Sequence, residues 1–239
     1  RDLDHKSANV QKVVKAYLKF LKEDLGYIGF RYDMVKGFDA SHVGDYNTAT
    51  GIQYSVGEYW DGVGNIKNWI NNTGKKSGAF DFQFHYNMTD AIRSNNWTKL
   101  NNSSLMSDVS YRQYAITFVE NHDIQVREDN SNEGSKDPIP TAYIPAANAF
   151  MIAMPGTPCI FQPHWKAYEH ELKSMIEARK LAGITNTSSY NNYANNKQYF
   201  ANAVNGTNGR KLLVVVGIPS MMTTPSKTEY TRILSGKNY

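Results

Sequence analysis

The sequence predicts an α/β fold with a parallel sheet, followed by a small antiparallel β domain. Over most of the chain, short apolar stretches of strand type alternate with helical stretches, which is the pattern of repeated βα units. After about residue 186 the alternation stops, and two strand-like stretches flank a Gly-Thr-Asn-Gly turn, as in a β-hairpin. These observations predict a parallel-sheet domain over 1–185 and an antiparallel β domain over 186–239.

The expected elements follow from apolar periodicity. A first helix is expected over 8–24, because apolar residues recur every three or four positions there and Gly26 ends the pattern. The other expected helices cover 64–71, 144–154 and 170–181, with helix and loop between 90 and 105. Parallel strands are expected at 28–35, 53–60, 79–82, 114–119 and 159–162, and antiparallel strands at 199–204 and 212–218.

The composition bounds the class of protein. The chain has 239 residues, of which 41% are hydrophobic, enough for one large domain or a domain with a small companion. Its 26 basic and 22 acidic residues are scattered, whereas nucleic-acid binding needs a basic face. No stretch reaches the roughly 18 apolar residues of a membrane span. Cys159 is the only cysteine, which excludes an internal disulfide, and its apolar neighbours predict a buried thiol.

Three acidic residues follow three of the predicted strands. Asp33, Glu58 and Asp123 each come after an apolar stretch, and parallel strands bring their carboxyl ends to one edge of the sheet. Like charges gathered there raise each other's pKa, and Arg31 and His122 could offset part of that repulsion. A glycosidase uses such a group, with one ionised carboxylate as nucleophile and another carboxyl as acid.

Each of these acids also has an ordinary interpretation. An Asp after a strand is more often a turn former or a helix N-cap, and the Asn-His-Asp sequence ending at Asp123 could equally form a turn. Glu58 could be an exposed loop residue. The occurrence of all three in order, each at the end of an apolar strand, favours a shared site.

Five segments then resemble a known family. Residues 30–37 read FRYDMVKG, residues 56–60 read VGEYW, and residues 118–123 read FVENHD. These segments resemble three conserved regions of the α-amylase family, glycoside hydrolase family 13. Residues 79–82 (AFDF) and 155–161 (PGTPCIF) resemble its sixth and eighth barrel strands. Among family members, the motifs look most like those of plant-type and related bacterial α-amylases.

The resemblance implies a role for each matching residue. Asp33 would be the nucleophile, Glu58 the general acid and then base, and Asp123 the group that stabilises the distorted sugar. Arg31 would hold Asp33 ionised, and His122 would bind sugar hydroxyls. The stereochemical outcome would be retention, for which the two reacting carboxyl groups lie about 5–5.5 Å apart.

Further ligand contacts are implied less directly. Lys36 resembles a residue that contacts sugars on the leaving-group side. Tyr59 and Trp60 could stack on sugar rings or pack in the core. Many family members bind calcium, and the backbone carbonyl of Gly37 matches one of the ligands. Because calcium takes about six to eight oxygen ligands, most of them would come from outside this sequence.

The resemblance also implies an incomplete barrel. Residues 1–185 would be strands four to eight of a (β/α)8 TIM barrel, beginning with its third helix. Five strands cannot close such a barrel. We therefore expect a fragment whose missing barrel half belongs to the rest of a parent protein, with little or no activity on its own. Since polymeric starch is usually met outside the cytoplasm, a secreted or cell-surface location is expected.

Several functions are compatible with these motifs. The first is a retaining α-amylase that cleaves α-1,4-glucosidic bonds in starch-like polysaccharides or oligosaccharides. The second is a related α-glucosidase or transglycosylase, because subsites beyond the cleavage point decide between these activities. The third is a catalytically silent glucan-binding protein on an amylase scaffold, against which the joint presence of Asp33, Glu58 and Asp123 argues. A purely structural α/β domain would leave the convergence of three carboxylates unexplained.

Overall fold

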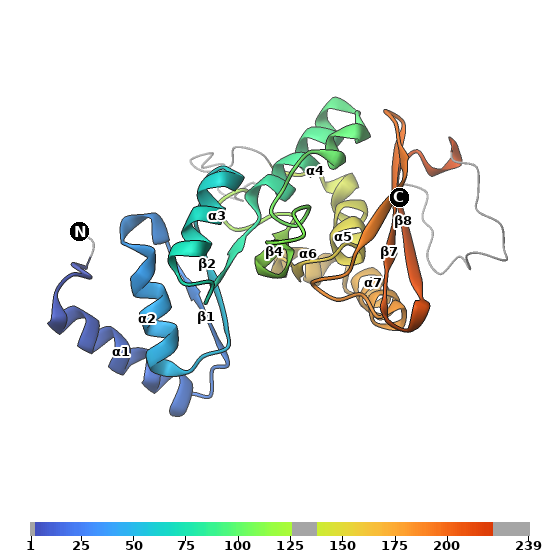
Figure 1. Ribbon diagram of the computed structural model, residues 1–239. Helices are drawn as coiled ribbons and strands as arrows, with labels where there is room; N and C mark the ends of the chain where they lie inside the picture. The colour runs from blue at the N-terminus through green and yellow to red at the C-terminus, as the bar shows by residue number, and fades with distance from the viewer. Residues whose placement is uncertain (1–2, 126–137, 222–239) are drawn as a thin grey trace.

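A computed structural model describes residues 3–125 and 138–221 of the chain. These residues form a parallel sheet of five strands, in the order β1-β2-β3-β4-β5, and an antiparallel sheet of three strands, in the order β6-β7-β8. Helices connect the strands of the parallel sheet, and the antiparallel sheet follows the last long helix (Figure 1). The structure confirms the predicted fold class, an open half-barrel sheet followed by a small antiparallel sheet.

The five strands of the parallel sheet and the helices α1, α3, α5 and α7 lie close to the predicted positions. The strands are β1 (Gly29–Tyr32), β2 (Tyr54–Gly57), β3 (Gly78–Phe80), β4 (Ala115–Phe118) and β5 (Thr157–Cys159). The helices are α1 (Ala8–Glu23), α2 (Ala40–Thr50), α3 (Val63–Asn72), α4 (Phe82–Ser94), α5 (Ile144–Ala153), α6 (Gln162–Ala167) and α7 (Glu169–Ala182). Short 3₁₀ turns are η1 (Val35–Gly37), η2 (Trp97–Asn101), η3 (Arg112–Tyr114), η4 (Thr141–Tyr143), η5 (Thr207–Gly209) and η6 (Pro219–Met221).

The two faces of the parallel sheet differ in burial. On the helix side, Phe30 packs against α1 and α2, and Ala79 and Thr117 are 0% exposed. The strand register places Arg31 and Cys159 on the opposite face, where both are exposed. The prediction of a buried thiol is therefore wrong. Cys159 lies on the edge strand β5, and its side of the sheet is only partly covered.

Helix α2, most of helix α4, helix α6 and strand β6 were not predicted from apolar periodicity. Helix α2 has the sequence ASHVGDYNTAT, in which apolar residues are too few to show a helical repeat. Its ends carry the signal instead: the Asp39 side chain accepts a hydrogen bond from the Ser41 backbone N–H (2.9 Å), and Gly51 ends the helix with φ +60°. Strand β6 (Tyr190–Asn195) is rich in Asn, and it forms as the pairing partner of β7 (Tyr199–Asn205).

The antiparallel sheet is completed by β8 (Lys211–Gly217). Phe200 and Val204 of β7 are buried in the same apolar cluster as Phe150 of α5, so the small sheet packs on the helices of the parallel part. The boundary at residue 186 stays a prediction, and residues 222–239 of the predicted β domain lie outside the described residues.

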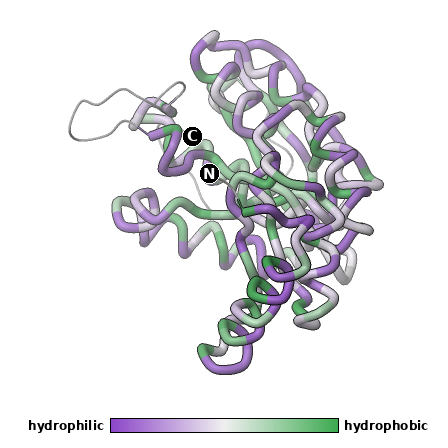
Figure 2. Tube along the Cα trace, turned by 90° about the vertical axis from the view of Figure 1, so that its left-hand side faces the viewer, coloured by the Kyte–Doolittle hydropathy of each residue, from purple (hydrophilic) through white to green (hydrophobic). Residues whose placement is uncertain are grey.

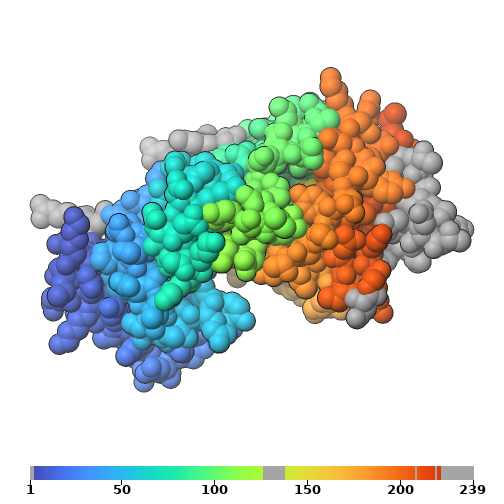
Figure 3. Space-filling model, in the orientation of Figure 1, coloured from blue at the N-terminus to red at the C-terminus, as the bar shows by residue number. Residues whose placement is uncertain are grey.

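The elements are laid out along one long direction. Helices α1 and α2 lie at one end and the antiparallel sheet lies at the other, with β4 between them (Figures 1 and 3). Along the helices hydrophobic and hydrophilic positions alternate, as expected for helices with one buried side (Figure 2). Within the described ranges, no helix combines the length and the apolar character that crossing a membrane requires.

Candidate functional site

The carboxyl ends of β1 and β2 bring Asp33 and Glu58 to one guanidinium group. Arg31 Nη2 lies 3.1 Å from Glu58 Oε1, and Arg31 Nη1 donates a hydrogen bond to Asp33 Oδ1. The Asp33 side chain is 67% exposed, whereas that of Glu58 is 8% exposed. Two neighbouring carboxyl groups thus share a cation but differ strongly in their contact with water.

The backbone around Glu58 explains how it is held. The Glu58 N–H donates to the Tyr32 carbonyl (2.9 Å), and the Glu58 carbonyl accepts from the Val35 N–H (3.2 Å), so the β1–β2 pairing continues past both strands. Met34 adopts the left-handed conformation with φ 42° and ψ 46°. Its N–H donates to Glu58 Oε2 at 3.1 Å. An unfavourable backbone conformation here thus coincides with an oriented carboxylate, as is common at functional sites.

Gly57 places the strand end directly on an aromatic ring. A Cβ atom at this position would lie 2.2 Å from Cη2 and 2.6 Å from Cζ2 of Trp69 in α3. Trp69 is 3% exposed, so its ring cannot move aside into solvent. Only glycine permits this contact. The indole of Trp69 therefore determines where the backbone of Gly57, the residue before Glu58, lies relative to α3.

Burial raises the pKa of the Glu58 carboxyl above its ordinary value of 4.5. The hydrogen bond from Met34 and the charge of Arg31 act in the opposite direction, and the nearby Asp33 carboxyl adds to the increase. Desolvation is the largest of these effects. A carboxyl group of this kind keeps its proton to higher pH than an exposed one, which is the property required of a general acid.

The third predicted acid lies further along the same edge of the sheet. Asp123 follows β4, and its Oδ2 is 3.3 Å from His122 Nε2. The Asn121 side-chain oxygen accepts hydrogen bonds from the backbone N–H groups of Asp123 and Ile124, both at 3.0 Å, which makes this segment a tight turn. Within residues 3–125 and 138–221, no ion pair or hydrogen bond joins Asp123 to Asp33 or Glu58.

The remaining predicted sugar-binding residues have protein partners. Lys36 Nζ lies 2.8 Å from Asp61 Oδ2 and is half exposed. Trp60 stacks on Phe82 with ring centroids 4.8 Å apart, and its Nε1–H donates to the Tyr86 hydroxyl at 2.8 Å.

Tyr59 is half-buried like Trp60, and its ring centroid lies 6.1 Å from that of Trp69. Packing therefore accounts for much of the surface of Tyr59 and Trp60, and their stacking on sugars stays a prediction.

The predicted calcium ligand lies in the turn that follows β1. Gly37 is exposed, and its N–H donates to the Met34 carbonyl at 3.0 Å. Among the described residues, no group of three or more His, Cys, Asp or Glu side chains is arranged to hold a metal ion. The calcium site at Gly37 stays a prediction.

Two buried groups at this edge were not predicted from the sequence. Glu120, inside the FVENHD segment, is 7% exposed and pairs with His164 of α6 at 2.9 Å. Asp81 is fully buried, where it caps α4 and accepts hydrogen bonds from the N–H groups of Phe84 (3.1 Å) and Met106 (2.8 Å). A charged residue directly after an apolar strand was the available signal for both.

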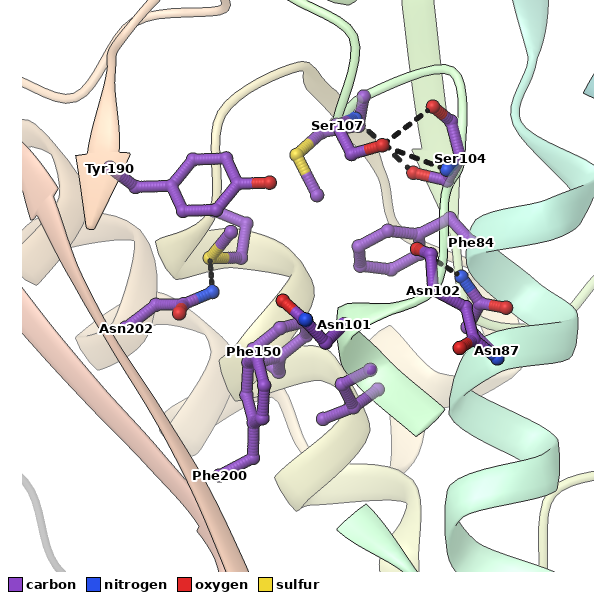
Figure 4. Close-up of a pocket in the computed structure, with 13 residues that line it drawn as sticks. Phe84, Asn87, Asn101, Asn102, Ser104, Ser107, Phe150, Tyr190, Phe200 and Asn202 are labelled. Carbon is purple, nitrogen blue, oxygen red and sulfur yellow. Dashed lines mark hydrogen bonds between the residues drawn. The ribbon is translucent and has the colours of Figure 1, made fainter. Parts of the chain in front are cut away.

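A small cavity lies away from this edge, between the parallel part and the antiparallel sheet (Figure 4). Its volume is about 20 Å³, which suffices for about one water molecule and excludes a sugar ring. Polar side chains line it together with apolar ones, among them Asn101, Ser104, Ser107, Tyr190 and Asn202. None of the predicted site residues borders it, so the candidate site is the open edge formed by β1, β2 and β4.

Known proteins of similar sequence are glucan-acting enzymes. No protein-family model matches the chain. A probable α-amylase 2 of Arabidopsis thaliana is 26% identical over 259 aligned positions, which cover 100% of this chain and 60% of that protein. An α-amylase of Bacillus licheniformis is 28% identical over 200 positions, covering 75% of this chain and 38% of that protein. The chain thus spans at most 60% of the length of these two relatives.

Solved structures show the same fold. A cyclomaltodextrin glucanotransferase with three domains gives a TM-score of 0.72 at 17% identity, covering 91% of this chain and 50% of that one. The α-amylase of Geobacillus thermoleovorans, solved with acarbose, gives 0.68 at 13% identity, covering 87% of this chain and 52% of that one. In sequence and in fold, the chain resembles the C-terminal part of proteins of the α-amylase family.

Proposed function

We propose that this chain carries the reacting groups of a retaining glycoside hydrolase that cleaves α-1,4-glucosidic bonds in starch-like glucans. The observation that carries the proposal is the pair Asp33 and Glu58 on Arg31, with one carboxyl exposed and the other buried. The unequal environments match unequal tasks, because retention needs an ionised nucleophile and a protonated acid side by side.

The proposed reaction has two steps. Asp33 attacks the anomeric carbon and forms a glycosyl ester, while Glu58 donates its proton to the departing glycosidic oxygen. The Glu58 carboxylate then takes a proton from water, the resulting oxygen attacks the same carbon, and Asp33 leaves. Asp123 and His122 bind hydroxyls of the sugar at the point of cleavage, and Lys36 binds on the leaving-group side.

Several features support an origin in a longer protein. The chain spans 60% of its plant relative, and the face of the sheet that holds Arg31 is only partly covered. Among the described residues, no hydrogen bond or ion pair brings Asp123 to the Asp33–Glu58 pair. We infer that further sequence closes the barrel, completes the cleft and supplies any calcium ligands, and that the 239 residues alone hydrolyse starch poorly or not at all.

The test compares the longer protein with its Glu58→Gln variant on soluble starch, with reducing ends and their anomeric configuration as the readout. We expect α-anomeric products from the parent and a loss of about 10²–10⁴-fold in rate in the variant, the usual contribution of a general acid. The glutamine side chain keeps the size of Glu58, and its oxygen can accept from the Met34 N–H while its NH₂ group faces Arg31. The control is therefore a circular dichroism spectrum like the parent's, which shows that the variant is folded. Starch binding without hydrolysis by the parent would instead identify a silent glucan-binding protein.

A further inference from the structure

A buried polar network lies behind the predicted sugar-binding turn. Glu120 follows β4, Asn148 belongs to α5 and His164 belongs to α6, and the three are 7%, 0% and 3% exposed. His164 Nε2 lies 2.9 Å from Glu120 Oε2, and His164 Nδ1 lies 3.2 Å from Asn148 Nδ2. All three side chains are buried, and their hydrogen bonds run to other groups of the protein.

The hydrogen-bond pattern assigns the hydrogen on the imidazole. Asn148 Nδ2 donates to the Ile144 carbonyl at 2.9 Å, and the reversed amide would put two oxygens face to face. The same Nδ2 group therefore points its other hydrogen at His164 Nδ1, which has to accept. The ring hydrogen is then on Nε2, from where it is donated to the Glu120 carboxylate.

Glu120 connects His164 to the backbone around it. Its second oxygen, Oε1, accepts the Ile139 N–H at 3.0 Å. The carbonyl of the preceding residue, Val119, lies 2.6 Å from His85 Nδ1 of α4. Helices α4 and α6 thus hold two consecutive residues in place immediately before the Asn121 turn, which presents His122 and Asp123.

We propose that His164 is a positioning residue: held by Asn148 as the Nε2–H tautomer, it fixes Glu120 and through it the turn that presents His122 and Asp123. The positioning role for catalysis rests on the function proposed above. The network itself can be tested without any activity.

The first experiment measures backbone amide hydrogen exchange at Asp123 and Ile124 in the 239-residue chain. His164→Leu removes the donor to Glu120 and the acceptor for Asn148, and we expect exchange at these two amides to rise about tenfold or more. His164→Gln is the matched control, because its amide can donate to Glu120 while its oxygen accepts from Asn148; we expect exchange within about threefold of the parent's. Equal exchange in all three proteins would overturn the proposal.

A second variant guards against simple unfolding. Glu120→Gln keeps the volume, but its NH₂ group must face either the Ile139 N–H or the His164 Nε2–H, so we expect the same local rise in exchange. The amide of Met175 in α7 serves as reference and should not change. If it changes as much as Asp123, the effect is global and the positioning role is rejected. Nitrogen NMR of the His164 ring tests the tautomer directly, and a hydrogen on Nδ1 would contradict the assignment.

Activity then separates this inference from the proposed function. In the longer protein we expect His164→Leu to lower kcat on soluble starch about tenfold or more, with KM changed less, and His164→Gln to restore kcat. If the parent shows no hydrolysis, the proposed function fails while the exchange result stands. If the parent is active and His164→Leu has full kcat, the positioning role fails while the proposed function stands.

Discussion

Two acid groups at the same edge of the sheet are built in opposite ways. At β1 and β2, Arg31 serves both Asp33 and Glu58, and Asp33 is open to water. After β4, Glu120 accepts one hydrogen bond on each carboxylate oxygen and is buried. A fully paired carboxylate fixes the chain, whereas a carboxylate with spare capacity can act on a ligand. Burial and partners, more than residue type, separate the two.

The largest expected difference is in stability. Removing Glu120 leaves the Ile139 N–H and the His164 Nε2–H buried without their acceptor. Since each unsatisfied donor costs about 1–3 kcal/mol, we expect Glu120→Ala to lower the free energy of unfolding by about 2–5 kcal/mol. Asp33→Ala removes an exposed ion-pair member and should cost about 1 kcal/mol or less. Urea unfolding of the two variants of the 239-residue chain measures both values. Equal losses of unfolding free energy in the two variants would contradict the difference drawn here between Glu120 and Asp33.

A smaller effect concerns the pH dependence of Glu58. Its pKa is raised in the folded chain, so its contribution to stability is complete below 4.5 and is lost as the pH rises through the raised value. A glutamine at this position does not titrate. The Glu58→Gln variant should therefore gain stability relative to the parent as the pH rises. The melting temperature of the variant minus that of the parent should be larger at about pH 8 than at about pH 4.

The contrary outcome for this second prediction is also defined. A gap that shrinks with rising pH would mean that Arg31 and Met34 outweigh burial at Glu58. The assignment of Glu58 as the acid would then lose its support.

The smallest expected effect belongs to Lys36. Its amine pairs with Asp61 at 2.8 Å, and both side chains are accessible to solvent. Lys36→Ala should leave the melting temperature unchanged within error. If the residue also binds sugar in the longer protein, KM for starch should rise a few-fold with kcat unchanged, and Asp61→Asn serves as the matched control for loss of the pair. An unchanged KM would reduce Lys36 to a surface residue.

The sequence predicted the order of strands and the acids that follow them, because alternation of apolar strands with helices determines a parallel sheet. It did not predict α2, whose capping residues Asp39 and Gly51 carry the signal that its interior lacks. The burial of Cys159 was predicted wrongly, since an apolar neighbourhood in sequence does not reveal that β5 is an edge strand.

For the candidate site, the difference in solvent exposure between Glu58 and Asp33 could not be predicted from the sequence. Both follow an apolar strand, and only the three-dimensional arrangement shows Met34 and Arg31 enclosing one of them. The network behind the turn was missed for a related reason. His164 is separated from Glu120 by 44 positions in the chain, and no local pattern joins them.

The contact between Gly57 and Trp69 has a spectroscopic consequence. The indole is 3% exposed, and its Nε1 has no hydrogen-bond partner among the described residues. Emission from this ring should therefore lie far to the blue. Because the ring touches the backbone directly before Glu58, any ligand that displaces the end of β2 will change the intensity of that emission. With the other three tryptophans replaced by phenylalanine, Trp69 would thus report optically on the residue proposed as the acid.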